Sequence, residues 1–192
     1  KNIVANENVP RLQKEHNGNG GTGADLIYPD RLFKQHWSMR LHTERVTARH
    51  FGAGHTGGDA IVHFERANVV HMGDLVFNRL YPFIDLKGEG TIPGWISVLE
   101  EASKEYPADA IYIYGHGKEG FGVTGTRNDI LLMRDYLSAL WETVDVDRAA
   151  GKSLDEMKER QRLDQFSEFS GGWAGAFQAN IEAAFREMEA GD

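Results

Sequence analysis

Three short β-prone runs in this 192-residue chain are each followed by glycine and then by a residue that can bind a metal ion. Residues 46–51 precede His55, residues 68–72 precede Asp74, and residues 110–114 precede His116. Glycine lets the backbone turn sharply at the end of a strand, and functional side chains are often carried on such turns. We therefore expect the three residues to meet on loops at one edge of a sheet and to form a metal site.

Each of these positions also has a simpler interpretation. A histidine beside glycine can be a hydrogen-bonded turn residue, and an aspartate after glycine can cap a turn. The metal hypothesis rests on the same pattern occurring three times. Because the chain has no cysteine, its metal ligands would have to be His, Asp or Glu.

Composition narrows the range of partners. The net charge of -8 argues against a nucleic-acid partner, which requires a basic surface. No apolar stretch approaches the ~20 residues that cross a membrane, so no membrane partner is expected. The chain begins with Lys1 and without a signal-type segment, which suggests a processed protein or part of a longer one. The location stays open between the cytoplasm and a bacterial periplasm.

The order of the expected elements predicts an α+β fold. Strands are expected over 41–51, 60–64, 69–72 and 110–114, all in one sheet, with a hairpin turn at 65–68. Apolar residues at three- and four-residue spacing predict helices over 93–105, 127–144 and 173–188. These helices are expected to cover one face of the sheet. The pattern Ser153-Leu-Asp-Glu156 predicts a capping box that opens a further short helix.

The glycine-rich segment 17–24 is expected to be a flexible loop. It contains the spacing G-x-G-x-x-G at Gly18, Gly20 and Gly23. That spacing binds a dinucleotide only between a buried strand and a helix, and the polar residues 11–16 that precede it do not read as a buried strand.

Four ordered motifs resemble the metallo-β-lactamase fold superfamily of metal-dependent hydrolases. They are GHTGGD at 54–59, VHMGDLVF at 70–77, YPFID at 81–85 and YGHG at 114–117. The resemblance covers nearly the whole chain and implies a single domain, 1–192, with a metallo-β-lactamase-like αβ/βα sandwich. The superfamily's H-x-H-x-D-H signature is absent, so the chain resembles the C-terminal part of such a protein, incomplete on its N-terminal side. We expect self-association, or pairing with the missing N-terminal part, to cover the open face of the sheet.

The resemblance also implies roles for the three candidate ligands. His55 would bind one metal ion, Asp74 would bridge two and take part in catalysis, and His116 would bind the second. The complete site would hold two zinc ions, or manganese or iron, while this chain alone is expected to be poorly metallated. Four other motif residues are expected near the cleft, as supports for the ligands or as substrate contacts: Asp59, His71, Tyr81 and Asp85.

The implied activity is metal-dependent hydrolysis of a small molecule. A hydroxide held by the metals would attack an ester, thioester or lactone, although this chain alone is expected to be inactive. Two alternatives stay open: a non-catalytic binding or structural module that keeps half of a hydrolase fold, and a true β-lactamase. The resemblance disfavours the second, because true β-lactamases generally place another residue where this chain has Asp74.

Overall fold

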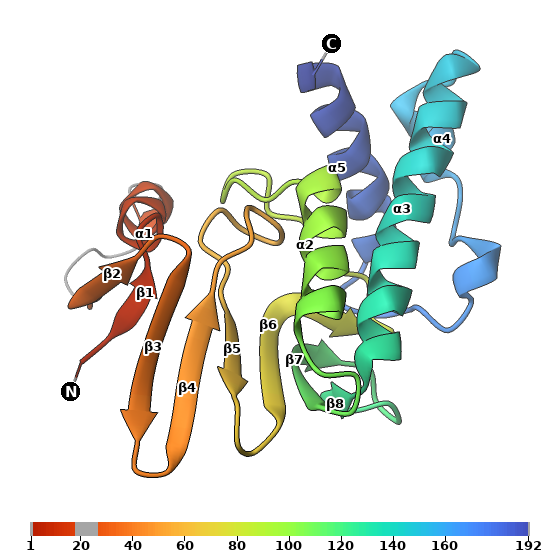
Figure 1. Ribbon diagram of the computed structural model, residues 1–192. Coiled ribbons are helices and arrows are strands. Elements are labelled where there is room, and N and C mark those ends of the chain that lie inside the picture. The colour runs from red at the N-terminus through yellow and green to blue at the C-terminus, as the bar shows by residue number, and fades with distance from the viewer. Residues whose placement is uncertain (1, 18–26, 192) are drawn as a thin grey trace.

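The computed structural model describes residues 2–17 and 27–191, and its centre is a six-stranded sheet with helices on one side (Figure 1). The strands, in spatial order, are β3 (His36–Leu41), β4 (Glu44–Arg49), β5 (Ile61–Phe64), β6 (Val69–Asn78), β7 (Ile111–Gly117) and β8 (Thr124–Gly125). Only the β6–β7 pair is parallel among these neighbours. The expected strands do share one sheet, but the β3–β4 hairpin starts at His36 rather than at Leu41.

The helical segments after β6 are α2 (Ile92–Glu105), α3 (Arg127–Ala149), α4 (Leu154–Lys158), the 3-10 turn η1 (Asp164–Phe166) and α5 (Ala176–Gly191). Of these, α2, α3 and α4 begin at capping residues that the sequence provides. Thr91 caps α2, while Thr126 and Ser153 form capping boxes at α3 and α4. The side-chain oxygens of these residues accept hydrogen bonds from free N–H groups of the first turn, which fixes where each helix begins.

The core lies between the sheet and the pair α2 and α3. Val70 and Tyr112 of the sheet are fully buried, as are Trp95 of α2 and Ile130 of α3. The expectation that all three long helices cover the sheet is wrong in one respect, because α5 packs mainly on α3 and α4. That helix also begins at Ala176, three residues later than expected.

The opposite face of the sheet carries a row of apolar side chains. The strand registers align Met39, Val46, Phe64, Val69 and Ile111 across β3 to β7. Residues paired across neighbouring strands point to the same face, and this row alternates with the residues that α2 and α3 cover. Met39 is 43% exposed and Ile111 is 55% exposed, so both ends of the row face solvent.

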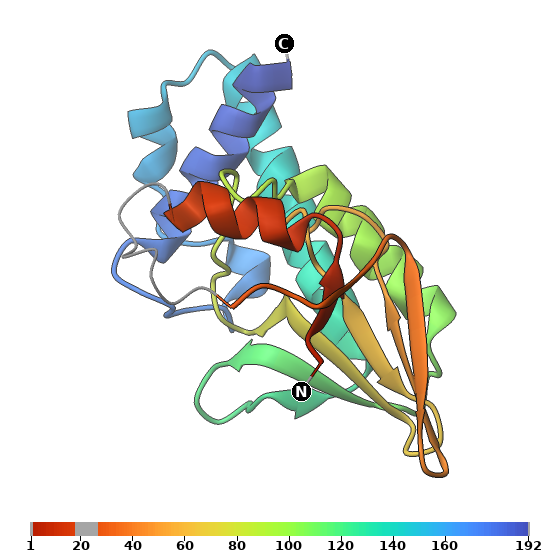
Figure 2. The same cartoon turned by 90° about the vertical axis from the view of Figure 1, so that its left-hand side faces the viewer.

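The N-terminal segment lies beside β3 (Figures 1 and 2). It consists of β1 (Val4–Asn6), α1 (Val9–Asn17) and β2 (Arg31–Phe33), with β1 and β2 paired in parallel. Of the glycine-rich loop expected over 17–24, Asn17 ends α1 and the rest lies outside the described residues. Within the described ranges, no helix combines the length and the apolar character needed to cross a membrane.

Candidate metal centre

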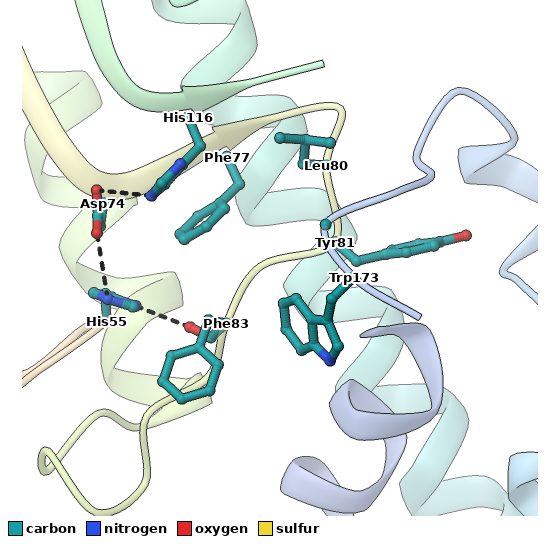
Figure 3. Close-up of a pocket in the computed structure, with 9 residues that line it drawn as sticks. His55, Asp74, Phe77, Leu80, Tyr81, Phe83, His116 and Trp173 are labelled. Carbon is teal, nitrogen blue, oxygen red and sulfur yellow. Dashed lines mark hydrogen bonds and ion pairs between the residues drawn. The ribbon is translucent and has the colours of Figure 1, made fainter. Parts of the chain in front are cut away.

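Three separate segments bring His55, Asp74 and His116 together (Figure 3). His55 lies in the loop between β4 and β5, Asp74 in β6 and His116 in β7. The Nε2 atom of His55 lies 3.7 Å from Oδ2 of Asp74, and Nε2 of His116 lies 3.5 Å from Oδ1. Each imidazole therefore faces a different oxygen of one carboxylate.

Asp74 reaches this position through an irregularity in the middle of β6. The register between β6 and β7 shifts on either side of Gly73, whose φ is +54°, a conformation that glycine adopts without strain. A Cβ on Gly115 of β7 would overlap Oδ1 of Asp74. The expectation that all three candidates follow their strands on loops is thus wrong for Asp74 and His116, which lie within strands.

The loop that carries His55 is held by its own side chains. Asp59 accepts hydrogen bonds from the backbone N–H of Thr56 at 2.9 Å and from its hydroxyl at 2.7 Å. Burial raises the pKa of the Asp59 carboxyl, although the bonds from Thr56 favour its charged form. Asp59 therefore supports the loop beneath His55.

The orientation of the His55 ring is set by the backbone of Phe83. The Nδ1 atom of His55 lies 2.9 Å from the Phe83 carbonyl oxygen, so a neutral imidazole donates its proton there. Nε2 then keeps its lone pair on the side of Asp74. An imidazole oriented by such a bond is the arrangement that metal-binding histidines usually show.

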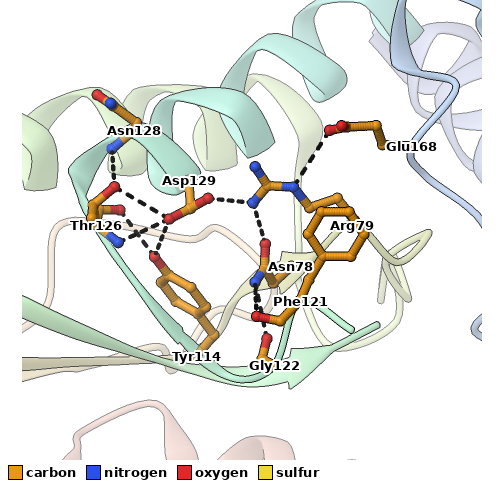
Figure 4. Close-up of polar contacts among 9 residues, drawn as sticks. All are labelled: Asn78, Arg79, Tyr114, Phe121, Gly122, Thr126, Asn128, Asp129 and Glu168. Carbon is orange, nitrogen blue, oxygen red and sulfur yellow. Dashed lines mark hydrogen bonds and ion pairs between the residues drawn. The ribbon is translucent and has the colours of Figure 1, made fainter. Parts of the chain in front are cut away.

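His116 is held by packing and by a polar cluster at the ends of β6 and β7. Its ring stacks on Phe77, with the ring centres 4.6 Å apart. Beyond it, the Asn78 amide donates to the Gly122 carbonyl at 2.9 Å, and Arg79 forms an ion pair with Asp129 of α3 (Figure 4). This cluster fastens the site-bearing ends of both strands to the helix layer.

The polar cluster around Arg79 and Asp129 lowers the pKa of the Asp129 carboxyl. Partial burial alone would raise the pKa, but hydrogen bonds from Arg79, Thr126 and Tyr114 outweigh it and lower the pKa below 3.8. Neither Arg79 nor Asp129 was singled out in the sequence. The capping pattern that opens α3 at Thr126 was the one local signal near them.

A cavity of about 430 Å³ opens in front of the three candidates. The rest of its wall consists of Phe77, Leu80, Tyr81, Phe83, Gly172 and Trp173. Trp173 was expected on the buried side of the last helix, yet it precedes α5, is 42% exposed and lies at the cavity wall. Its place there depends on the turn around Gly171 and Gly172, both with positive φ.

Among the other candidates, Tyr81 alone lines the cavity. Its ring points away from the opening (Figure 3) and packs on Tyr136 and Phe177. His71 is exposed, and its Nδ1 accepts from the Gly73 N–H at 3.1 Å. It does not line the cavity, and its role as an orienting group stays a prediction.

The fourth candidate, Asp85, lies in a turn between β6 and α2. Its Oδ1 accepts from the Gly88 N–H at 2.9 Å. It lines a separate hollow against α1, together with Val9 and Leu12. Asp85 thus shapes the chain between Phe83 and α2 rather than the cavity wall.

The donors suit a metal ion in kind but are few in number. Imidazole nitrogen and carboxylate oxygen are usual ligands of zinc, and His55 is oriented as such a ligand. In the part of the chain that the structure describes, however, no group of three or more His, Cys, Asp or Glu side chains is arranged to hold a metal ion. These residues thus offer a partial ligand set.

Comparison with solved structures agrees with the sheet and helix arrangement. A metallo-β-lactamase from Pontibacter korlensis matches 71% of this chain with a TM-score of 0.55 at 16% identity. The stereoselective inverting sec-alkylsulfatase Pisa1 from Pseudomonas sp. matches 84% with a TM-score of 0.63 at 14% identity. The chain has the metallo-β-lactamase fold.

This chain has low sequence identity to both solved structures and covers only part of their length. The chain spans 58% of the Pontibacter protein and 27% of the alkylsulfatase. No protein-family model matches the sequence, and no curated protein sequence matches it. The expected fold class is confirmed.

Proposed function

We propose that this chain contributes His55, Asp74 and His116 to the site of a metal-dependent hydrolase that cleaves ester, thioester or lactone bonds. The supporting observation is the arrangement of two imidazoles on the two oxygens of one carboxylate, at 3.7 and 3.5 Å. It lies at the mouth of a cavity of about 430 Å³, within the ~300–1,000 Å³ typical of small-molecule sites. The metallo-β-lactamase fold is shared with metal-dependent hydrolases, which adds to the case.

The residues of the chain have separable tasks in this proposal. His55 and His116 would each direct Nε2 toward a metal ion, and Asp74 would hold the metal with its carboxylate. A bound zinc ion would supply Lewis acidity and lower the pKa of its water. The Phe83 carbonyl keeps the His55 ring turned toward Asp74, and Phe77 keeps the His116 ring beside it.

Cobalt(II) titration tests the ligand assignment, because its visible absorption reports the atoms that bind it. Cobalt binding, and the binding of the zinc that displaces it, should each be weaker in His55→Ala, Asp74→Ala and His116→Ala. His36→Ala is the matched control, since His36 is exposed on β3 and does not line the cavity. An unchanged affinity in all three site variants would overturn the assignment.

Hydrolysis is measured on the protein expressed as its whole gene encodes it, loaded with zinc or manganese. The panel contains esters, thioesters and lactones, together with a β-lactam and a secondary alkyl sulfate as comparisons. Cleavage of the first three classes, lost in Asp74→Asn, is the expected result. Metal binding without cleavage would favour a non-catalytic binding module, and cleavage of the β-lactam alone would favour a true β-lactamase.

A further inference from the structure

The cavity wall opposite the three polar residues is apolar and largely aromatic. Leu80, Phe83 and Trp173 line it, and Phe77, stacked on His116, continues the apolar surface toward the polar end. His55, Asp74 and His116 stand at the other end of the cavity (Figure 3). A ligand that fills this space therefore meets polar atoms at one end and carbon surface along the rest.

Two aromatic side chains on this wall are unusually open to solvent. Phe83 is 51% exposed and Trp173 is 42% exposed. Their rings meet edge to face with the centres 5.9 Å apart. They come from distant segments, and the turn before Trp173 is tied to the end of β6 because the Ser170 N–H donates to the Arg79 carbonyl at 3.1 Å. The pair thus forms a preset aromatic surface at the cavity.

The wall also carries no positive charge. None of the described residues that line the cavity is lysine or arginine, and Asp74 is the one acidic side chain among them. The two cations that follow the site strands are engaged elsewhere. Arg79 pairs with Asp129, and the Lys118 ammonium donates to the Glu168 carbonyl at 2.8 Å. An anionic group on the non-reacting part of a ligand would find no partner on this wall.

We propose that this cavity selects substrates whose non-reacting part is uncharged and carries an aromatic or alkyl group, which packs on Phe83 and Trp173. This inference rests on the proposed function for the identity of the reacting bond, but the recognition itself needs no metal. An aromatic pair stabilises a complex beyond the area it buries, and an uncompensated charge on the ligand counts against binding. The charge of the ligand and its aromatic ring therefore determine its affinity separately.

The test is NMR titration of the metal-free protein with three ligands that it cannot hydrolyse. These are 4-phenylbutanamide, its analogue with an anionic carboxylate on the para position of the ring, and the ringless butanamide. We expect the phenyl amide to bind at least about tenfold more tightly than either of the others, with shifts at the amide signals of Phe83 and Gly172. Equal or tighter binding of the ring-carboxylated amide would overturn the charge argument, and equal binding of butanamide would overturn the aromatic one.

Variants identify the binding surface. Trp173→Ala and Phe83→Ala should each lower the affinity for 4-phenylbutanamide about threefold to tenfold. Phe121→Ala is the matched control, because Phe121 is also 42% exposed but does not line the cavity. An equal loss in this control would refute the assignment to Phe83 and Trp173. Selective amide binding without any hydrolysis would sink the proposed function and leave this inference standing.

Discussion

The Nδ1 atom of His55 and the carbonyl oxygen of Phe83 lie 2.9 Å apart. This contact connects the loop after β4 with the aromatic wall of the cavity, 28 residues further along the chain. It also assigns the ring proton, because a carbonyl oxygen can only accept. The neutral His55 ring must then carry its proton on Nδ1 and present Nε2 toward Asp74.

The first prediction concerns this tautomer. Long-range proton–nitrogen NMR spectra of the neutral imidazole should show His55 protonated at Nδ1. Added zinc should then shift the Nε2 signal most strongly. A ring protonated at Nε2 would contradict the hydrogen bond from His55 to the Phe83 carbonyl and remove one of the two imidazole donors.

The second prediction concerns the close approach of β7 to Asp74. Gly115→Ala places a methyl group where Oδ1 of Asp74 lies, so the carboxylate or the strand must move. We expect a loss of about 1–3 kcal/mol in the free energy of unfolding, as for other overpacked sites, together with weaker cobalt binding. Gly191→Ala, at a glycine with open space around its Cα, should change neither quantity in a urea titration and a metal titration.

The third prediction concerns acid sensitivity. Because the folded-state pKa of Asp129 is below its usual 3.8, its carboxylate stabilises the fold above that pH. The contribution is lost as the pH falls through the lowered folded-state value. Asp129→Asn should lower the free energy of unfolding by about 1–3 kcal/mol at pH 7. The loss should become smaller as the pH drops below 4.

Urea unfolding at pH 7 and at several values below 4 measures this difference. Asp164→Asn provides the comparison, since the Asp164 side chain is 91% exposed and should have a small effect at every pH. A loss for Asp129→Asn that stays constant down to the lowest pH would show that the Arg79 pair does not depend on the charged carboxylate.

The fourth prediction concerns metal content. One carboxylate and two imidazoles cannot complete two zinc sites, each of which needs three or four protein ligands. The 192 residues should therefore retain at most one zinc equivalent, and dialysis against a chelator should remove it. Two equivalents that survive this treatment, measured by elemental analysis, would require ligands beyond His55, Asp74 and His116.

The fifth prediction concerns the apolar row from Met39 to Ile111. Exposed apolar area on a sheet face commonly marks an interface, and we propose that a second copy of this chain covers it. Sedimentation should show a dimer that Ile111→Lys dissociates. Val146→Lys, at an exposed position on the helix side, should leave it intact. A monodisperse monomer at all concentrations would rule this interface out and leave the row open for an N-terminal segment of a longer protein.

Much of the fold could be predicted because its signals are local. The spacing of Ile130, Met133, Leu137 and Leu140 marks one face of a helix, and these side chains are all buried in α3. The capping pattern at Ser153 marks a helix start whatever surrounds it. The convergence of His55, Asp74 and His116 could also be expected, because each follows a strand-forming run.

Other features depend on contacts between distant segments. Trp173 fits the apolar spacing of α5, yet its turn is tied to Arg79, and this takes the side chain out of the helix to the cavity. Tyr81 was expected near the cleft and does line the cavity, but its ring packs on Tyr136 and Phe177 in the core. Neither outcome has a signal within a few residues of the side chain concerned.

By itself, the sequence determined the strands β4 to β7, the long helices with the Ser153 cap, and the three residues that meet at the site, while β1, α1, β2 and β8 were not predicted. Side-chain periodicity and the hydrogen bonds of a helix end act over a few residues, so a short window contains them. Only the tertiary structure decided that β6 would bulge at Gly73, that Gly115 would leave room for Asp74, and that Phe83 and Trp173 would meet. Those features follow from the packing of strands and loops that lie far apart in the chain, and packing is a property of the whole fold.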